Sequence, residues 1–110
     1  MTLRTLCSLA VVSLFSATAY AGSQVGTVDF IIARASDGLT YFGLKGAAKD
    51  ASPACATQSY WMIKDENSEA GKKQYAMLLA AQASGRPVIV HGMGTCTRWR
   101  DGEDVNYIRL

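Results

Sequence analysis

The first 21 residues constrain this chain more than any other segment, because they have the features of a leader for export. Arg4 provides a positive charge, and the apolar run at residues 6–15 shows no 3.6-residue period. Ala19-Tyr20-Ala21 has the small-x-small pattern of a cleavage site. The apolar run is too short to span a bilayer, which needs about 20 residues. We therefore predict a signal peptide at 1–21 and an exported single domain at 22–110, periplasmic or secreted.

Export also decides how the cysteines are used. Of the three cysteines, Cys7 leaves with the leader, so Cys55 and Cys96 remain as an even pair. Such a pair in a small exported chain predicts one disulfide bond. In the chain-entropy model, closing a loop of about 42 residues stabilises the fold by about 4 kcal/mol. A redox pair or two metal ligands are the alternatives, but there is no C-x-x-C spacing and His91 is the only histidine.

The hydrophobic content and the net charge of the chain limit the classes of partner that it is expected to bind. The chain is 49% hydrophobic and 18% charged, as in globular domains rather than disordered chains. Its net charge of +2 is too small for a nucleic-acid footprint, so no nucleic acid is expected. After removal of the leader we predict no membrane span and no cofactor.

Alternation of apolar and polar residues predicts five strands. The first two, at 25–34 and 39–46, form a hairpin around Ser36-Asp37-Gly38. In the first of them, Val28, Phe30 and Ile32 share one face. The others are expected at 57–64, 88–91 and 105–110, with Tyr60 and Trp61 on opposite faces of the third and Trp61 in the core.

One helix is predicted at 69–84, between the third and fourth strands. Asn67 or Ser68 can cap its start, and Gly85 followed by Pro87 ends it. Its inner stripe is expected to hold Ala70, Gln74, Met77, Leu78 and Ala81. The order β-β-β-α-β-β is that of the OB-fold, so we predict a mainly β protein with an OB-fold-like five-stranded barrel. A flat sheet covered by one helix is the alternative.

A set of residues spread over the mature chain carries a resemblance to known proteins. It includes Gly26-x-Val28, Tyr41-Phe42, Pro53-Ala54-Cys55-Ala56-Thr57, Trp61-x-Ile63, Ala70-Gly71-Lys72, Ala83-Ser84-Gly85-x-Pro87-Val88, Gly92-x-Gly94-x-Cys96, Trp99 and Val105-x-Tyr107-Ile108-x-Leu110. With these the chain resembles a group of short exported bacterial proteins of uncharacterised function. More loosely, it resembles the pentamer-forming B subunits of subtilase cytotoxin. The resemblance implies an OB-fold, and it suggests glycan binding and a homo-oligomer.

The candidate ligand-binding residues are Arg98, Trp99 and Arg100, together with Tyr41 and Tyr60. A tryptophan between two guanidinium groups can stack on a sugar and donate hydrogen bonds to an anion, and OB-fold loops bind oligosaccharides. The structural alternative is that Trp99 packs over the disulfide while the arginines pair with Asp101, Glu103 or Asp104.

Catalytic and metal chemistry is weakly supported. His91 is expected to be a structural residue, because it sits in an apolar strand before Gly92. A Ser-His-Asp triad is not indicated, because no serine has a nucleophile-elbow pattern around it. Asp101, Glu103 and Asp104 are hard oxygen ligands suited to calcium, but they lack the EF-hand spacing. We predict no catalytic residue and no metal.

The sequence therefore favours a non-enzymatic binding module whose partner is a glycan or another envelope or host protein. The alternatives are a periplasmic enzyme inhibitor or small hydrolase that uses His91, and a structural component of the envelope.

Overall fold

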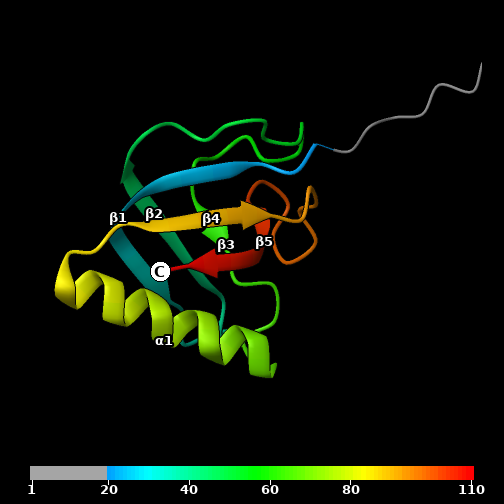
Figure 1. Cartoon of the computed structure of the whole chain (residues 1–110). Coiled ribbons are helices and arrows are strands. Elements are labelled where there is room, and N and C mark those ends of the chain that lie inside the picture. The colour runs from blue at the N-terminus through cyan, green and yellow to red at the C-terminus, as the bar shows by residue number, and fades with distance from the viewer. Residues whose placement is uncertain (1–19) are drawn as a thin grey trace, which may run out of the picture.

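The computed structural model describes residues 20–110, so all but the last two residues of the predicted leader lie outside the described residues. Five strands and one helix follow in the order β1 (Ser23–Ala33), β2 (Thr40–Gly46), β3 (Trp61–Met62), α1 (Glu69–Ser84), β4 (Val88–Gly92) and β5 (Glu103–Arg109). The strands pair in the order β1-β2-β3-β5-β4, and β4 pairs with β1 (Figure 1). The sheet thus closes into a ring, which confirms the mainly β prediction and excludes the flat sheet.

All pairs in the ring are antiparallel except β3 and β5, which are parallel. α1 lies along one end of the ring and carries the chain from β3 to β4 (Figure 1). The long connections before β3 and before β5 lie toward the other end (Figure 1). The disulfide Cys55–Cys96 joins these two connections, with a Cα–Cα distance of 6.2 Å, and confirms the predicted pairing.

β1 contains a bulge that the alternation pattern did not predict. Val28 pairs with Leu44 and Phe30 pairs with Gly43, so Asp29 is an extra residue in the ladder. Val28 is buried in the core, whereas Phe30 is half-buried and Ile32 is 38% exposed. The prediction of one shared face was therefore wrong. After the bulge, Ile31 packs against the core, so the Phe30 side chain lies on the outside of the ring of strands.

β3 is much shorter than the predicted strand at 57–64. The Ala56 amide donates to the Pro53 carbonyl, and the Thr57 amide donates to the Cys55 carbonyl. Because these amides are used in tight turns, they cannot join a ladder. The two faces were predicted correctly, since Trp61 is fully buried while Tyr60 is half-buried.

α1 has the predicted bounds and caps. The Ser68 hydroxyl accepts from the Gly71 amide at 3.0 Å, and Gly85 ends the helix at a φ of +68°. The inner stripe differs at its start, because Gly71 is buried and Ala70 is exposed. A Cβ on Gly71 would overlap the carbonyl of Asp65, so glycine allows the first turn to approach the chain closely.

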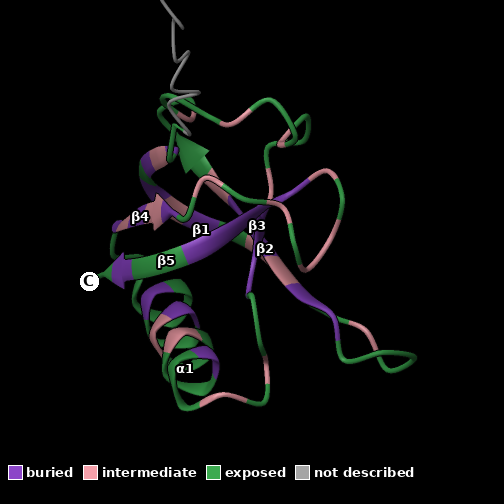
Figure 2. Ribbon diagram, turned by 90° about the vertical axis from the view of Figure 1, so that its right-hand side faces the viewer, coloured by how far each residue is buried: buried purple, intermediate pink, exposed green. Residues whose placement is uncertain are grey.

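The core fills the ring and the space between the ring and α1, as the buried segments in Figure 2 show. Trp61 is at its centre, and its indole N–H donates to the Gln24 side chain at 2.8 Å. The remaining buried apolar side chains include Phe42, Ile63, Leu78, Val88, Val90 and Val105. In the part of the chain that the structure describes, no helix is both long and apolar enough to cross a membrane.

Candidate ligand-binding face

Three aromatic rings lie side by side on the outside of the ring of strands. Phe30 of β1 contacts Tyr41 of β2 edge to face, with centroids 6.4 Å apart. Tyr41 contacts Tyr60, the residue before β3, at 5.2 Å. Gly43 makes room for this cluster, because a Cβ at that position would overlap the Phe30 ring. Two predicted residues, Tyr41 and Tyr60, are thus brought together, and Phe30 joins them through the bulge.

Trp99 lies on the β4–β5 connection, and two guanidinium groups lie over its indole ring. The guanidinium of Arg34, at the end of β1, lies 4.9 Å from the indole centroid, and that of Arg100 lies at 6.0 Å. Arg34 also forms an ion pair with Asp37 in the hairpin turn. This pairing lowers the pKa of Asp37 to about 2, first through the hydrogen bond from Arg34 and then through the Leu39 amide. The ion pair between Arg34 and Asp37 therefore holds the hairpin turn beside Trp99.

Tyr60 links the aromatic rings to the Trp99 loop. Its hydroxyl donates to the Asp101 carboxylate, and the Asp101 carbonyl accepts from the Gln58 amide at 3.1 Å. Burial and the hydrogen bond to Asp101 raise the pKa of Tyr60 to about 12, so the phenol is neutral near pH 7. We call this surface the aromatic–arginine face; it consists of Phe30, Arg34, Tyr41, Tyr60, Trp99 and Arg100.

Arg98 has a different position from the one expected. Its Nε lies 3.1 Å from both carboxylate oxygens of Glu66, and its Nη2 donates to the Asp37 carbonyl at 3.3 Å. Glu66 also accepts from the Thr40 amide at 2.8 Å. The Arg98 guanidinium therefore ties the β4–β5 connection to the segment before α1 and to the hairpin turn. Its partner is Glu66 rather than one of the acids at 101–104.

The predicted acidic group at 101–104 is divided among three sets of partners. Asp101 accepts from Tyr60, Glu103 accepts from the amides of Gly22 and Gly94, and Asp104 accepts from Thr95 and Thr97. Within residues 20–110 no group of three or more histidine, cysteine or acidic side chains is arranged to hold a metal ion. Each carboxylate instead fixes a different part of the loop.

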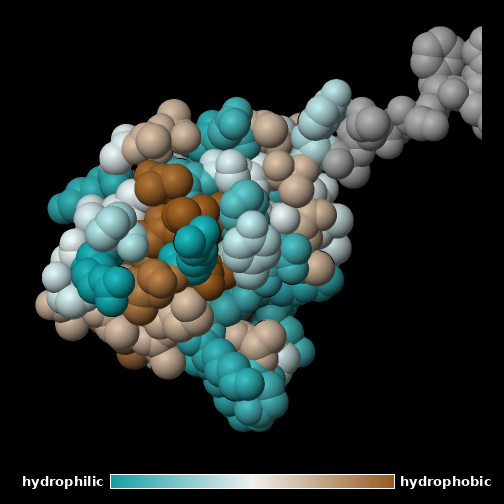
Figure 3. All heavy atoms as spheres, in the orientation of Figure 1, coloured by the Kyte–Doolittle hydropathy of each residue, from teal (hydrophilic) through white to brown (hydrophobic). Residues whose placement is uncertain are grey.

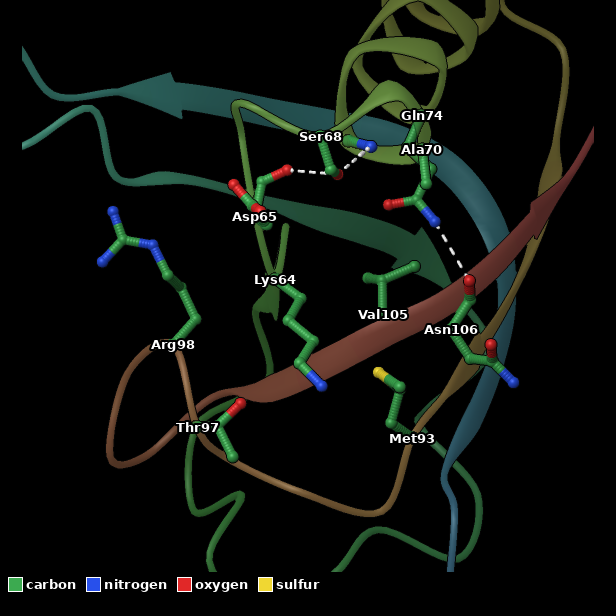
Figure 4. A pocket seen from close by; sticks show the side chains of 11 residues that line it. Lys64, Asp65, Ser68, Ala70, Gln74, Met93, Thr97, Arg98, Val105 and Asn106 are labelled. Carbon is green, nitrogen blue, oxygen red and sulfur yellow. Dashed lines mark hydrogen bonds between the residues drawn. The ribbon is translucent and has the colours of Figure 1, made fainter.

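A separate, open hollow lies between the start of α1 and β5. It has a volume of about 540 Å³, and Figure 4 shows Lys64, Asp65, Gln74, Met93, Arg98 and Asn106 around it. The Gln74 amide donates to the Asn106 carbonyl at 3.0 Å across its upper edge. None of the residues that line the hollow is aromatic. We favour the aromatic–arginine face as the site because three of its rings are packed against one another and one of them, Tyr60, is held by a hydrogen bond to Asp101.

His91 lies on β4 with its ring stacked on Tyr107 of β5, at a centroid distance of 4.5 Å. Cys55 and Cys96 are joined in the disulfide, so neither offers a thiolate. Beside the stack, the β1–β4 surface carries exposed apolar side chains, as Figure 3 shows. Val25, which is 49% exposed, pairs with Ile89 there.

Sequence reasoning missed Phe30 and Arg34 as members of the face. Arg34 is the last residue of the first predicted strand, so its place beside the hairpin turn was a usable signal. No local pattern showed that Asp29 is a bulge. Comparison of the chain with models of protein families, with curated proteins and with solved structures finds no match.

Proposed function

We propose that this chain is an exported, non-enzymatic binding module with an OB-fold, and that it binds a glycan on the aromatic–arginine face. The strand order β1-β2-β3-β5-β4, the parallel β3–β5 pair and the helix between β3 and β4 support the OB-fold. Export rests on the predicted leader, and a disulfide is a bond typical of exported proteins.

The observation that carries the binding proposal is where the aromatic–arginine face lies. In OB-folds, ligands bind across the second and third strands between the β1–β2 and β4–β5 loops. Here Tyr41 lies on β2, Tyr60 precedes β3, and Arg34 begins the β1–β2 turn. Trp99 and Arg100 come from the β4–β5 connection. The face therefore combines the usual ligand surface of this fold with side chains suited to a sugar.

The side chains of the face suggest an acidic glycan. Aromatic rings present flat apolar surface to the C–H groups of a sugar. Arginine binds carboxylate groups through paired hydrogen bonds. Arg34 is held by Asp37, whereas Arg100 forms no salt bridge among the described residues and is exposed. Arg100 is thus the cation that we expect to contact an acidic group on the ligand.

A glycan array that contains sialylated and neutral oligosaccharides tests this proposal. We expect Trp99→Ala to raise Kd at least about tenfold for every bound glycan, the effect of losing one aromatic anchor. Arg100→Gln should weaken only the acidic glycans. Tyr75→Ala and Lys73→Gln, which alter exposed residues of α1, serve as matched controls and should bind normally. Binding that survives Trp99→Ala in a correctly folded variant would contradict the assignment of the face.

Self-association is a further part of the proposal. The exposed apolar surface around Val25 and Ile89 extends over β1 and β4 (Figure 3), and the resemblance to pentameric toxin subunits implies a ring of copies. We propose a second copy of the chain as the occupant of this surface. Light scattering on the processed protein distinguishes an oligomer from a strict monomer, and the latter would contradict this part alone.

A further inference from the structure

The chain enters the fold at Gly22, directly against a buried carboxylate. The Gly22 amide donates to Oε2 of Glu103 at 2.9 Å, and the Gly94 amide donates to the same oxygen at 3.1 Å. The Gly22 carbonyl accepts from the Gly92 amide at 2.8 Å. Glu103 has no exposed surface. The backbone at Gly22 is therefore held on both sides, and its nitrogen points at a carboxylate that water does not reach.

The space around this nitrogen fits glycine alone. A Cβ on Gly22 would lie 2.5 Å from Oε1 of Glu103, and a Cβ on Gly92 would overlap the carboxylate. The two described residues before Gly22 are on the surface, since Ala21 is exposed and Tyr20 is 64% exposed. The boundary between exposed and buried backbone thus coincides with the predicted cleavage point, the Ala21–Gly22 bond.

The carboxylate also has unused hydrogen-bonding capacity. Among the described residues, Oε1 of Glu103 and Nζ of Lys49 are buried without a hydrogen-bond partner, 3.8 Å apart. The Lys49 ammonium lies 3.9 Å from the centroid of the Trp61 ring. Burial lowers the pKa of Lys49, and the charge of Glu103 only partly offsets this. A peptide nitrogen donates one hydrogen bond, whereas an ammonium group donates three.

We infer that this place is a docking socket for a new N-terminus: removal of the leader leaves the α-ammonium group of Gly22 bound to Glu103. In the cleavage step an endopeptidase adds one water across the Ala21–Gly22 bond. Ala21 leaves with the carboxylate, and the amine that stays on Gly22 takes up a proton. One N–H then keeps the bond to Oε2, and the added donors satisfy Oε1. Processing thereby tightens the closure of the ring at β1. This inference rests on the export part of the proposed function.

The test compares two exported forms of the protein. In one, the leader is cleaved before Gly22; in the other, the cleavage site is moved so that Tyr20 and Ala21 remain and Gly22 keeps a peptide nitrogen. Charge-assisted hydrogen bonds are worth more than neutral ones, so we expect the equilibrium constant for unfolding to be about tenfold smaller for the form that starts at Gly22. In Glu103→Gln this difference should fall below about twofold. Glu69→Gln, on the exposed surface of α1, should leave it unchanged.

A second measurement applies even if Glu103→Gln does not fold. The α-amine of the form that starts at Gly22 should react with an acylating reagent at least about tenfold more slowly than the amine of the form that starts at Tyr20. Equal stabilities of the two forms, or equal acylation rates, would overturn the inference. N-terminal sequencing of the exported native chain tests the export proposal separately, because a different start would contradict the cleavage site without bearing on the socket in the engineered forms.

Discussion

Asp104 shows how one buried carboxylate can shape a whole loop. It accepts hydrogen bonds from the Thr95 hydroxyl at 2.7 Å and from the Thr97 hydroxyl at 2.6 Å, and further ones from the amides of Thr97 and Arg98. Burial acts to raise the pKa of Asp104, but these hydrogen bonds outweigh it, and the pKa lies below its ordinary value. The β4–β5 loop, which contains Trp99, is thus folded around the negative charge of the Asp104 carboxylate.

We predict that Asp104→Asn destabilises the protein by about 2–3 kcal/mol at pH 7, because an amide cannot accept all four hydrogen bonds. Because the folded-state pKa is depressed, this stability is present above the unfolded pKa of about 4 and is lost as the pH falls through the folded pKa. The free energy of unfolding, measured by urea titration from pH 7 to pH 2, should therefore fall less steeply in Asp104→Asn than in the unmodified protein.

Asp29→Asn is the control for this experiment, because Asp29 is exposed at the bulge of β1. It should follow the unmodified protein at every pH. If the free energy of unfolding falls equally steeply with pH in Asp104→Asn and in the unmodified chain, the ionised Asp104 carboxylate does not contribute this stability.

At the scale of elements, α1 owes its ends to local chemistry and its position to packing. Ser68 and Gly85 set its limits, as their residue types predict. Leu78 and Ala81 are fully buried against the ring of strands, and Gly71 lets the first turn approach the chain before it. A helix of 16 residues is marginal on its own in water, so this packing supplies most of its stability.

We expect Ser68→Ala to lower the free energy of unfolding by about 1 kcal/mol, because the Gly71 amide would lose its side-chain acceptor. Denaturant unfolding followed by circular dichroism measures this. Ser84→Ala in the last turn is the matched control, since the Ser84 hydroxyl donates only to carbonyls of its own helix. An equal loss in the two variants would contradict a capping role for Ser68.

At the scale of the entire fold, the disulfide joins the two long connections that contain no helix, the one before β3 and the one before β5. It links residues separated by 41 positions and brings the segment before β3 to the loop that carries Trp99. The Tyr60–Asp101 hydrogen bond joins the same two connections. The aromatic–arginine face is therefore assembled from the paired strands β1 and β2 together with two connections that the disulfide and this hydrogen bond hold side by side.

Replacement of both cysteines by serine should lower the free energy of unfolding by about 4 kcal/mol, the loop-closure value for this separation, less any strain released. Guanidinium titration with and without a reductant measures the effect. Reductant should destabilise the unmodified protein and leave the double variant unchanged. A chain that is equally stable in both conditions would show that the bond contributes little to the fold.

Features that adjacent residues control could be predicted before the structure was known. The bounds of α1, the hairpin at Gly38 and the burial of Trp61 follow from capping, turn chemistry and hydrophobic pattern, all of which act over a few residues. The Cys55–Cys96 disulfide was predicted because these are the two cysteines that remain after the predicted leader is removed. Of the predicted ligand residues, Tyr41, Tyr60, Trp99 and Arg100 lie together on the face, and their binding role stays a prediction.

Features that depend on distant partners could not be predicted and became visible in the folded protein. The bulge at Asp29, the ion pair of Arg98 with Glu66 and the hydrogen bond of Gly22 to Glu103 each involve segments far apart in the chain. Their free energy comes from contacts that exist only once the ring closes. Local propensity cannot report such contacts, because a residue's type does not reveal which distant group it will meet.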